Sequence, residues 1–216
     1  MKVYPINLNV ENKRCVVIGG GKVAYRKILG LLDSGAVVEV IAPEICAEIK
    51  NLLDENKITV TLEKYSSNKL GEGLILIAAS DDKDVNNRAV ADGRAKNFLV
   101  NSVNDFADFT VPSKILRGDF LLTVSTGGTS PAFSKFVREM SENEFDENFA
   151  DGLKIIADYR RKIKEILPDV DDRINFWREV LTPELWQLLK DSKLDELREI
   201  LKGKIYELDN STAGGD

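Results

Sequence analysis

The first hundred residues alternate short apolar runs with longer stretches in which apolar positions recur every three or four residues. Short runs rich in Val and Ile are typical of buried strands, and the longer spacing is typical of amphipathic helices. We expect strands at 15–18, 37–41, 59–63, 74–78 and 99–102, and helices at 23–34, 43–55 and 84–96. Strands separated by helices of this length form right-handed βαβ units. The sequence therefore predicts an α/β fold with a parallel sheet of the Rossmann type.

The pattern changes after residue 108. Two extended segments, 109–116 and 119–125, flank Arg117-Gly118 and predict a hairpin. From residue 142 onward the chain is strongly charged and its apolar residues recur at helical spacing, which predicts a helical C-terminal region. The small polar residues 211–216 are expected to form a flexible tail.

A glycine-rich loop follows the first predicted strand and opens the first predicted helix. It matches the pattern G-x-G-x-x-A at Gly19, Gly21 and Ala24. Gly19 permits a tight turn, Gly21 lets the backbone approach a pyrophosphate without an intervening Cβ, and Ala24 allows the helix to pack close to the strand. Together with Lys22 and Val23, these residues are the predicted pyrophosphate site at a helix N-terminus. A tight structural turn without a ligand is the alternative.

The loops after the second and fourth strands supply the other predicted cofactor contacts. Pro43 and Glu44 follow the second strand, and Ser80 and Asp81 follow the fourth. Ligands of doubly wound sheets bind at the carboxyl ends of the strands, so we expect both loops beside the cofactor. For Asp81 the alternative is a helix cap or a first-turn charge. Ala42 occupies the place of the usual ribose-binding acid. Glu44 is the candidate to replace it, and the choice between NAD and NADP stays open.

Two further clusters are candidates for substrate chemistry. Asn104 and Asp105 follow the fifth strand and place a carboxamide and a carboxylate at the same edge, with an Asx-type turn as the alternative. A second glycine-rich loop opens a helix for which Ser130 and Pro131 suit the N-cap and the first position. Its hydroxyls and backbone N–H groups predict an anion site at Ser125, Thr126, Gly127, Gly128, Thr129 and Ser130, with a capped helix after a glycine turn as the alternative.

Composition excludes several classes of function. The net charge of −6 argues against nucleic-acid binding. No apolar stretch approaches membrane-spanning length and the N-terminal residues lack the apolar run of a signal peptide, so we expect a cytoplasmic protein. The chain has no histidine, so acid–base chemistry falls to other side chains or the substrate, and no metal site is expected. Cys15, in a strand, and Cys46, on the apolar side of a helix, are expected to be buried thiols.

Taken together, these motifs resemble the precorrin-2 dehydrogenase and sirohydrochlorin ferrochelatase family, which includes the N-terminal region of sirohaem synthase. The resemblance covers about residues 1–140. The segments that carry it are Tyr4-Pro5, Val16–Ala24, Arg26-Lys27, Ala78–Asp82, Asn86, Asn101, Pro112-Ser113 and Ser125–Pro131.

The resemblance implies an NAD-binding Rossmann-type domain at 1–112, a small dimerisation segment at 113–145 and a helical C-terminal domain at 146–210, ahead of the tail. It implies a homodimer that oxidises precorrin-2 to sirohydrochlorin in sirohaem biosynthesis, with NAD as the hydride acceptor. In some members ferrous iron is then inserted as a further substrate. An acidic enzyme needs local cations to hold a polycarboxylated tetrapyrrole, and the candidates near the second loop are Lys114, Arg117, Lys135 and Arg138.

One position departs from the family pattern. The family has an aspartate, its proposed residue for proton removal and metal insertion, where this chain has Asn104. An amide is not a base near neutral pH. Three alternatives stay open: Asp105 takes the role through a local bulge, the proton is lost to water, or the activity is weakened. We therefore favour the dehydrogenase over the chelatase. Two other classes also stay open, a non-catalytic NAD-sensing regulatory domain and a tetrapyrrole-binding or metal-delivery protein.

Overall fold

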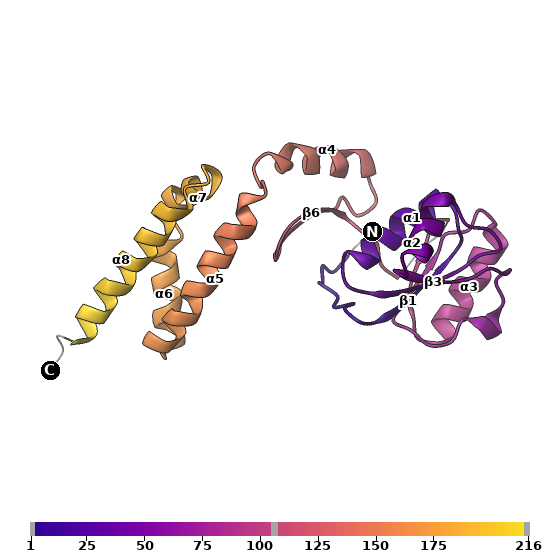
Figure 1. Cartoon of the computed structure of the whole chain (residues 1–216), viewed down its shortest axis with the longest axis horizontal. Coiled ribbons are helices and arrows are strands. Elements are labelled where there is room, and N and C mark those ends of the chain that lie inside the picture. Colours follow the sequence, from indigo (N-terminus) through magenta and orange to yellow (C-terminus); the bar gives the residue numbers. More distant parts are fainter. Residues whose placement is uncertain (1–2, 105–107, 214–216) are drawn as a thin grey trace. The chain divides into compact units, whose positions relative to one another are not determined.

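The computed structural model describes residues 3–104 and 108–213 and divides the chain into two compact units (Figure 1). Tyr4–Val111 forms the first, which we call the sheet unit. The chain from Pro112 onward, with Val3, forms the second, which we call the C-terminal unit.

The sheet unit contains a five-stranded parallel sheet in the order β3-β2-β1-β4-β5. Its strands are β1 (Arg14–Ile18), β2 (Val37–Ile41), β3 (Ile58–Thr61), β4 (Ile75–Ala78) and β5 (Leu99–Ser102). All five predicted strands are present, with shifts of one or two residues at their ends. The strand order reverses between β1 and β4, so the carboxyl ends of these two strands form the crevice where doubly wound sheets bind ligands.

Helices cover both faces of this sheet. They are α1 (Lys22–Leu32), α2 (Ala47–Asp54) and α3 (Lys83–Ala95), with a short 3₁₀ turn, η1, at Ser67–Lys69. Alternate strand residues point to opposite faces. Cys15 and Val17 pack with Ile28 of α1 and Ile49 of α2, whereas the opposite face packs against α3.

Helix α2 begins four residues later than the sequence predicts. Residues 43–46 instead form a loop, because the backbone N–H of Cys46 donates to the carbonyl of Gly20 at 2.8 Å. Cys46 is therefore the N-cap of α2 and is half-buried against the core of the sheet, where full burial within the helix was expected. Cys15 is fully buried as expected, and this burial raises the pKa of its thiol. Both cysteines are free thiols.

The C-terminal unit begins with an antiparallel hairpin, β6 (Ser113–Arg117) and β7 (Phe120–Val124). Arg117 pairs with Phe120, so the turn is Gly118-Asp119 and not the predicted Arg117-Gly118. Gly118 has a φ of +57°, a conformation that glycine adopts readily. Helix α4 (Pro131–Glu142) follows, and the predicted cap is confirmed: Ser130 Oγ accepts from Phe133 N at 3.2 Å.

Four further helices complete this unit. They are α5 (Asn148–Ile166), α6 (Val170–Val180), α7 (Pro183–Lys190) and α8 (Leu194–Ala213). Their apolar faces form one core, and an aromatic cluster joins β7 to it: Phe120 stacks on Phe145 at 4.9 Å, and Trp186 packs edge-on against Phe149 at 5.1 Å. Helix α8 extends to Ala213, into the segment expected to be a flexible tail. No helix in the described part of the chain is long and apolar enough to cross a membrane.

Candidate functional site

The glycine loop after β1 fits tightly between the loops that follow β2 and β4. A Cβ added to Gly19, which has a φ of +122°, would overlap the backbone of Ala79 and Ser80. A Cβ added to Gly20 would overlap the backbone carbonyl of Glu44. Backbone hydrogen bonds join the same segments, because Cys46 N donates to Gly20 O at 2.8 Å and Ala79 N donates to Ile18 O at 2.8 Å. Three of the predicted cofactor loops therefore meet at one edge of the sheet.

Gly21 differs from its two neighbours because its open side faces no other part of the described chain. A Cβ placed there meets no atom within 4 Å. Gly21 is the N-cap of α1, has no side-chain cap, and its carbonyl accepts the first helical hydrogen bond from Tyr25 N at 3.0 Å. The backbone N–H groups of Lys22, Val23 and Ala24, which come before this first bond, have no partner in the helix. They lie at the positive end of the helix dipole, where a phosphate binds favourably. This open, donor-rich surface fits the pyrophosphate of a dinucleotide.

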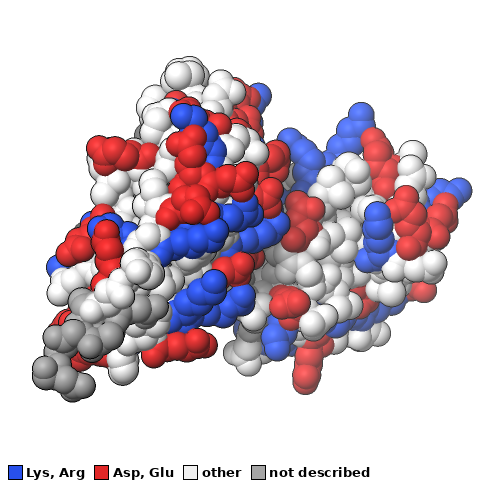
Figure 2. All heavy atoms as spheres, turned by 60° about the vertical axis from the view of Figure 1, so that its left-hand side comes forward, with Lys and Arg blue, Asp and Glu red and all other residues white. Residues whose placement is uncertain are grey.

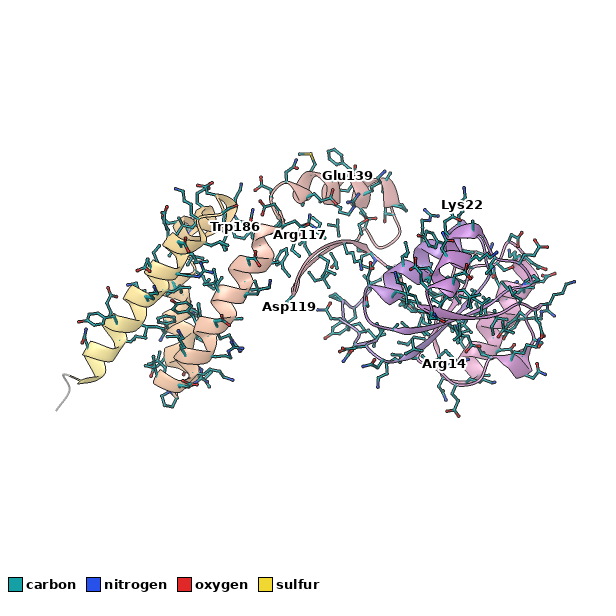
Figure 3. The ribbon with its side chains drawn as sticks, viewed as in Figure 1. Arg14, Lys22, Arg117, Asp119, Glu139 and Trp186 are labelled. Atoms are coloured by element: carbon teal, nitrogen blue, oxygen red, sulfur yellow. The ribbon has the colours of Figure 1, made fainter. Side chains whose placement is uncertain are left out.

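The side chains at the start of α1 have different surroundings. Ala24 is fully buried against the sheet, where it lets α1 pack closely. Val23 is 40% exposed, and Lys22 is exposed at the first turn (Figure 3). The first turn of α1 has no acidic residue that would neutralise the positive end of the helix dipole. Further along α1, burial and the neighbouring charge of Arg26 lower the pKa of Lys27.

The loop after β2 carries Pro43 and Glu44, both exposed, over Gly20. Glu39, the acid inside β2, is not available to a ribose because it pairs with Arg14 at 2.7 Å. Arg14 lies at the opposite end of β1 from the glycine loop (Figure 3). Glu44 is therefore the acidic candidate that remains in this loop, and its backbone carbonyl lies against Gly20.

The loop after β4 is held by Asn86, a fully buried side chain of α3. Its Oδ1 accepts from Ser80 N at 2.9 Å, and its Nδ2 donates to Ser80 O at 2.8 Å. Asp81 and Ser80 lie in the turn that Asp82 completes by capping α3. From the sequence alone, Asn86 is only one of the positions that carry the family resemblance. A polar residue on the sheet-facing side of a helix that follows a candidate ligand loop was the signal for its role.

Asn86 also joins the loop after β5 to this network. Its Nδ2 donates to Oδ1 of Asn104, which is exposed at the end of that strand. Asn101 is buried and donates to Phe109 O at 2.9 Å, so it supports the strand end. The predicted catalytic residue Asp105 lies outside the described residues.

The second glycine loop belongs to the C-terminal unit and is closed by its own hydroxyls. Thr126 Oγ1 accepts from Ser130 N at 3.0 Å, donates to Ser130 O at 3.1 Å and contacts Ser134 Oγ at 3.2 Å. Ser125 Oγ accepts from Gly127 N at 3.2 Å. Gly127 and Gly128 have φ values of +61° and +88°, which the turn requires. Ser125, Gly128 and Thr129 are the exposed members of the loop.

The cations proposed beside this loop are engaged by neighbouring groups. Lys135 and Arg138 pair with Glu139 one helical turn or less away, at 3.5 and 3.2 Å. Arg117 donates to Phe145 O at 3.0 Å, and Lys114 lies in β6 opposite Thr123. These side chains are therefore not a ready-made set of free cations for a polycarboxylate.

Sequence families match both units. Residues 6–113 match a family described as "Putative NAD(P)-binding", and residues 153–205 match the "Sirohaem synthase dimerisation region". The siroheme synthase of Acinetobacter baylyi is 29% identical over 210 residues, which cover 96% of this chain and 46% of that protein. The siroheme synthase of Nitrosococcus oceani is 33% identical over 183 residues, which cover 84% of this chain and 39% of that protein. The chain thus spans less than half the length of these relatives.

A solved structure has the same fold. SirC, a precorrin-2 dehydrogenase, superposes with a TM-score of 0.75 and 26% sequence identity, over 94% of this chain and 100% of that one. The similarity therefore extends through both units and not only through the sheet.

Proposed function

The chain belongs to the precorrin-2 dehydrogenase and sirohydrochlorin ferrochelatase family, to which the N-terminal region of sirohaem synthase also belongs, and we propose that it oxidises precorrin-2 to sirohydrochlorin with NAD as the hydride acceptor. The observation that carries this proposal is the surface at Gly21, where an open N-terminus of α1 stands at the switch point of a parallel sheet. When bound there, a nicotinamide cofactor accepts a hydride from the substrate, and one proton is released to balance the oxidation.

In this proposal the residues of the sheet unit bind and orient the cofactor. The N–H groups of Lys22 to Ala24 bind the pyrophosphate, and Gly21 leaves room for it. Pro43 and Glu44 lie beside the adenosine, with Glu44 accepting from the ribose hydroxyls. That contact suits NAD, because a 2′-phosphate would meet a carboxylate. Ser80 and Asp81, held by Asn86, border the remaining part of the cofactor.

Asn104 has a binding role in this proposal and does not remove a proton. Its Oδ1 is occupied by the Asn86 donor, so its Nδ2 hydrogens are directed to other partners, such as a substrate carboxylate. Positioning of hydride donor and acceptor supplies much of the rate. Iron insertion is not part of the proposal, because a carboxamide at this position does not take up the protons that a metal displaces from the macrocycle.

The exposed loop residues Ser125, Gly128 and Thr129 bind acidic side chains of the substrate in this account. Thr126 and Ser130 shape the loop through their internal hydrogen bonds. Gly127 permits the turn that presents the N–H groups.

We propose that the active form is a homodimer. The two-stranded sheet β6–β7 has no further strand among the described residues, which leaves strand edges that a second copy can pair with. Leu116 and Leu121 of this hairpin are 42% and 43% exposed, and α4 carries an exposed apolar stripe. Residues 153–205, which match a dimerisation region of sirohaem synthase, belong to the same unit but not to the hairpin or α4, and they support a second copy as the partner of the unit as a whole.

The experiment that tests the function is anaerobic incubation of the chain with precorrin-2 and NAD. Growth of the NADH absorbance together with the sirohydrochlorin spectrum supports the proposal. NAD binding without turnover would favour a sensing role, and tetrapyrrole binding without turnover would favour a carrier.

A further inference from the structure

The helices α5 and α6 line an open, basic cavity that the proposed reaction does not use. It has a volume of about 620 Å³, within the range of small-molecule sites. Four of its lining residues are Lys or Arg, and none is acidic. Figure 2 shows Lys and Arg side chains gathered in a band on the C-terminal unit, although the whole chain has a net charge of −6.

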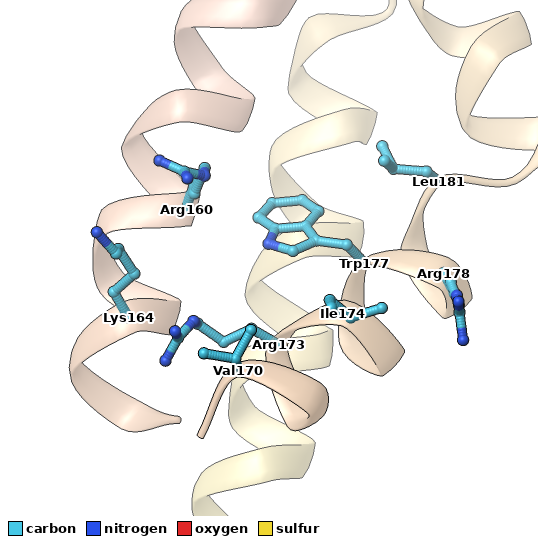
Figure 4. Close-up of a pocket in the computed structure, with 8 residues that line it drawn as sticks. All are labelled: Arg160, Lys164, Val170, Arg173, Ile174, Trp177, Arg178 and Leu181. Atoms are coloured by element: carbon cyan, nitrogen blue, oxygen red, sulfur yellow. The ribbon is translucent and has the colours of Figure 1, made fainter. Parts of the chain in front are cut away.

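The floor of the cavity is apolar and aromatic. Trp177 of α6 is half-buried, packs edge-on against Phe176 at 5.2 Å, and points its indole toward α5 (Figure 4). Ile174 and Leu181 beside it are 44% and 55% exposed. Exposed apolar side chains of this size that gather around a tryptophan offer a surface on which a flat ring system stacks.

Two cations on α5 stand over this floor. Arg160 and Lys164 are one helical turn apart on α5, and in Figure 4 both lie on the side of the indole that faces this helix. Neither has a hydrogen-bond or ion-pair partner within residues 3–104 and 108–213, whereas two other cations of α5, Lys154 and Arg161, pair with aspartates at 2.8 and 2.6 Å. Unpaired cations beside exposed apolar surface suit a ligand that carries both carboxylates and a ring.

The other two cations contribute less. Arg173 donates to the carbonyls of Leu167 and Pro168 and so closes the end of α5, while its charge remains beside Lys164. Arg178 lies at the rim with its guanidinium turned away from the indole (Figure 4). Lys164 also stabilises the C-terminal turn of α5 through the helix dipole, but Arg160, further from that end, has no such role.

We propose that this cavity is a binding site for a polycarboxylated aromatic macrocycle, with the ring against Trp177 and carboxylates on Arg160 and Lys164. The choice of a tetrapyrrole as that macrocycle rests on the proposed function. A site of this kind retains tetrapyrrole on the protein outside the sheet unit, where the cofactor binds. Guanidinium and ammonium groups bind carboxylates through charge-assisted hydrogen bonds, and the stacked ring supplies apolar contact.

The test uses uroporphyrin, a stable porphyrin polycarboxylate, as the probe. In the full chain with Trp186→Phe, Trp177 is the remaining tryptophan and reports directly on the cavity. We expect saturable quenching of its fluorescence, and the double variant Arg160→Gln/Lys164→Gln raises the Kd for uroporphyrin by roughly tenfold or more. The matched control Lys154→Gln/Arg161→Gln removes two cations from the same helix outside the cavity and leaves that Kd within about twofold. Circular dichroism and the Tm verify that each variant is folded.

Several results would overturn the proposal. An unchanged Kd in the cavity variant, or an equal loss in the control, removes Arg160 and Lys164 from the binding site. Displacement of uroporphyrin by citrate at equal carboxylate concentration reduces the cavity to a general anion site. A change of oligomeric state in the cavity variant with unchanged uroporphyrin binding assigns the cavity to contact with a second copy of the chain.

Precorrin-2 turnover with NAD separates this proposal from the proposed function. If the wild type binds uroporphyrin through the cavity but does not oxidise precorrin-2, the function fails and the cavity proposal stands. If the wild type oxidises precorrin-2 but Trp177 does not respond to uroporphyrin, the cavity proposal fails alone.

Discussion

The buried side chain of Asn86 holds Ser80 at both backbone polar groups, because its Oδ1 accepts from Ser80 N and its Nδ2 donates to Ser80 O. The same Nδ2 donates to Asn104, so one amide fixes two loops at the carboxyl edge of the sheet. Every hydrogen-bonding atom of this side chain is in use, which also fixes the orientation of its amide.

Replacement of Asn86 by alanine tests this arrangement. The variant leaves Ser80 without its partners, and we expect the free energy of unfolding to fall by about 1–3 kcal/mol. We also expect the KM for NAD to rise roughly tenfold, since the loop beside the cofactor loses its position. Asn87→Ala is the matched control, because Asn87 is the next residue of α3 and is exposed. An Asn86→Ala enzyme with the wild-type KM for NAD would show that the hydrogen bonds between Asn86 and Ser80 have only a structural role.

Gly20 and Gly21 are adjacent but have opposite surroundings, so their alanine variants should separate folding from binding. Gly21→Ala places a methyl group in open space, and we expect the free energy of unfolding to change by less than about 1 kcal/mol. The Kd for NAD should rise roughly tenfold, because the methyl group occupies the approach of the pyrophosphate. Gly20→Ala should instead destabilise the fold, since its Cβ overlaps Glu44. Calorimetric titration and urea unfolding measure the two effects. NAD binding unaffected by Gly21→Ala would place the pyrophosphate elsewhere.

Much of this arrangement was predictable from the sequence because it depends on local signals. Runs such as Val16–Ile18 indicated the strands, and Ser130-Pro131 indicated the start of α4. The predicted start of α2 was wrong by four residues, because a tertiary hydrogen bond from Cys46 to Gly20 holds residues 43–46 out of the helix. Local propensity does not contain that contact.

The site was predictable in outline and less so in its side-chain partners. The glycine spacing located the loop at α1, but nothing in the sequence shows that Glu39 pairs with Arg14 or that Asn86 clamps Ser80. The pairing of Lys135 with Glu139 was accessible, because residues four apart on a helix are neighbours. Arg160 and Lys164 have the same spacing, and their significance depends on Trp177, which approaches them from another helix.

The identity of residue 104 decides between two chemistries at one position. Asn104→Asp introduces a carboxylate that still accepts from Asn86 Nδ2 and, unlike an amide, takes up a proton. We expect the variant to gain the ability to insert ferrous iron into sirohydrochlorin. The reaction is monitored by absorbance under anaerobic conditions. Asn104→Ala serves as the control that removes the amide without adding a base. If neither the oxidation rate nor the chelation rate changes in Asn104→Asp, this position has no part in the chemistry.

The apolar stripe on α4 tests the proposed dimer. Phe133, Phe136 and Met140 are 56%, 55% and 62% exposed and share one side of the helix. We expect Phe136→Asp to shift the chain to a monomer in light scattering, because a charge at an apolar interface is costly to bury. Lys135→Asp, a neighbouring exposed position, should leave the mass unchanged. A Phe136→Asp protein with an unchanged mass would remove α4 from the interface.

The stoichiometry of the reaction tests most directly whether this chain oxidises precorrin-2 with NAD. Precorrin-2 and NAD are mixed with the chain without oxygen, and NADH and sirohydrochlorin are measured in the same sample, with Gly21→Val as the variant that blocks the pyrophosphate surface. We expect one NADH for each sirohydrochlorin formed, and loss of both products in the variant. Sirohydrochlorin that forms at the same rate without NAD, or no product from the folded wild type, would contradict it.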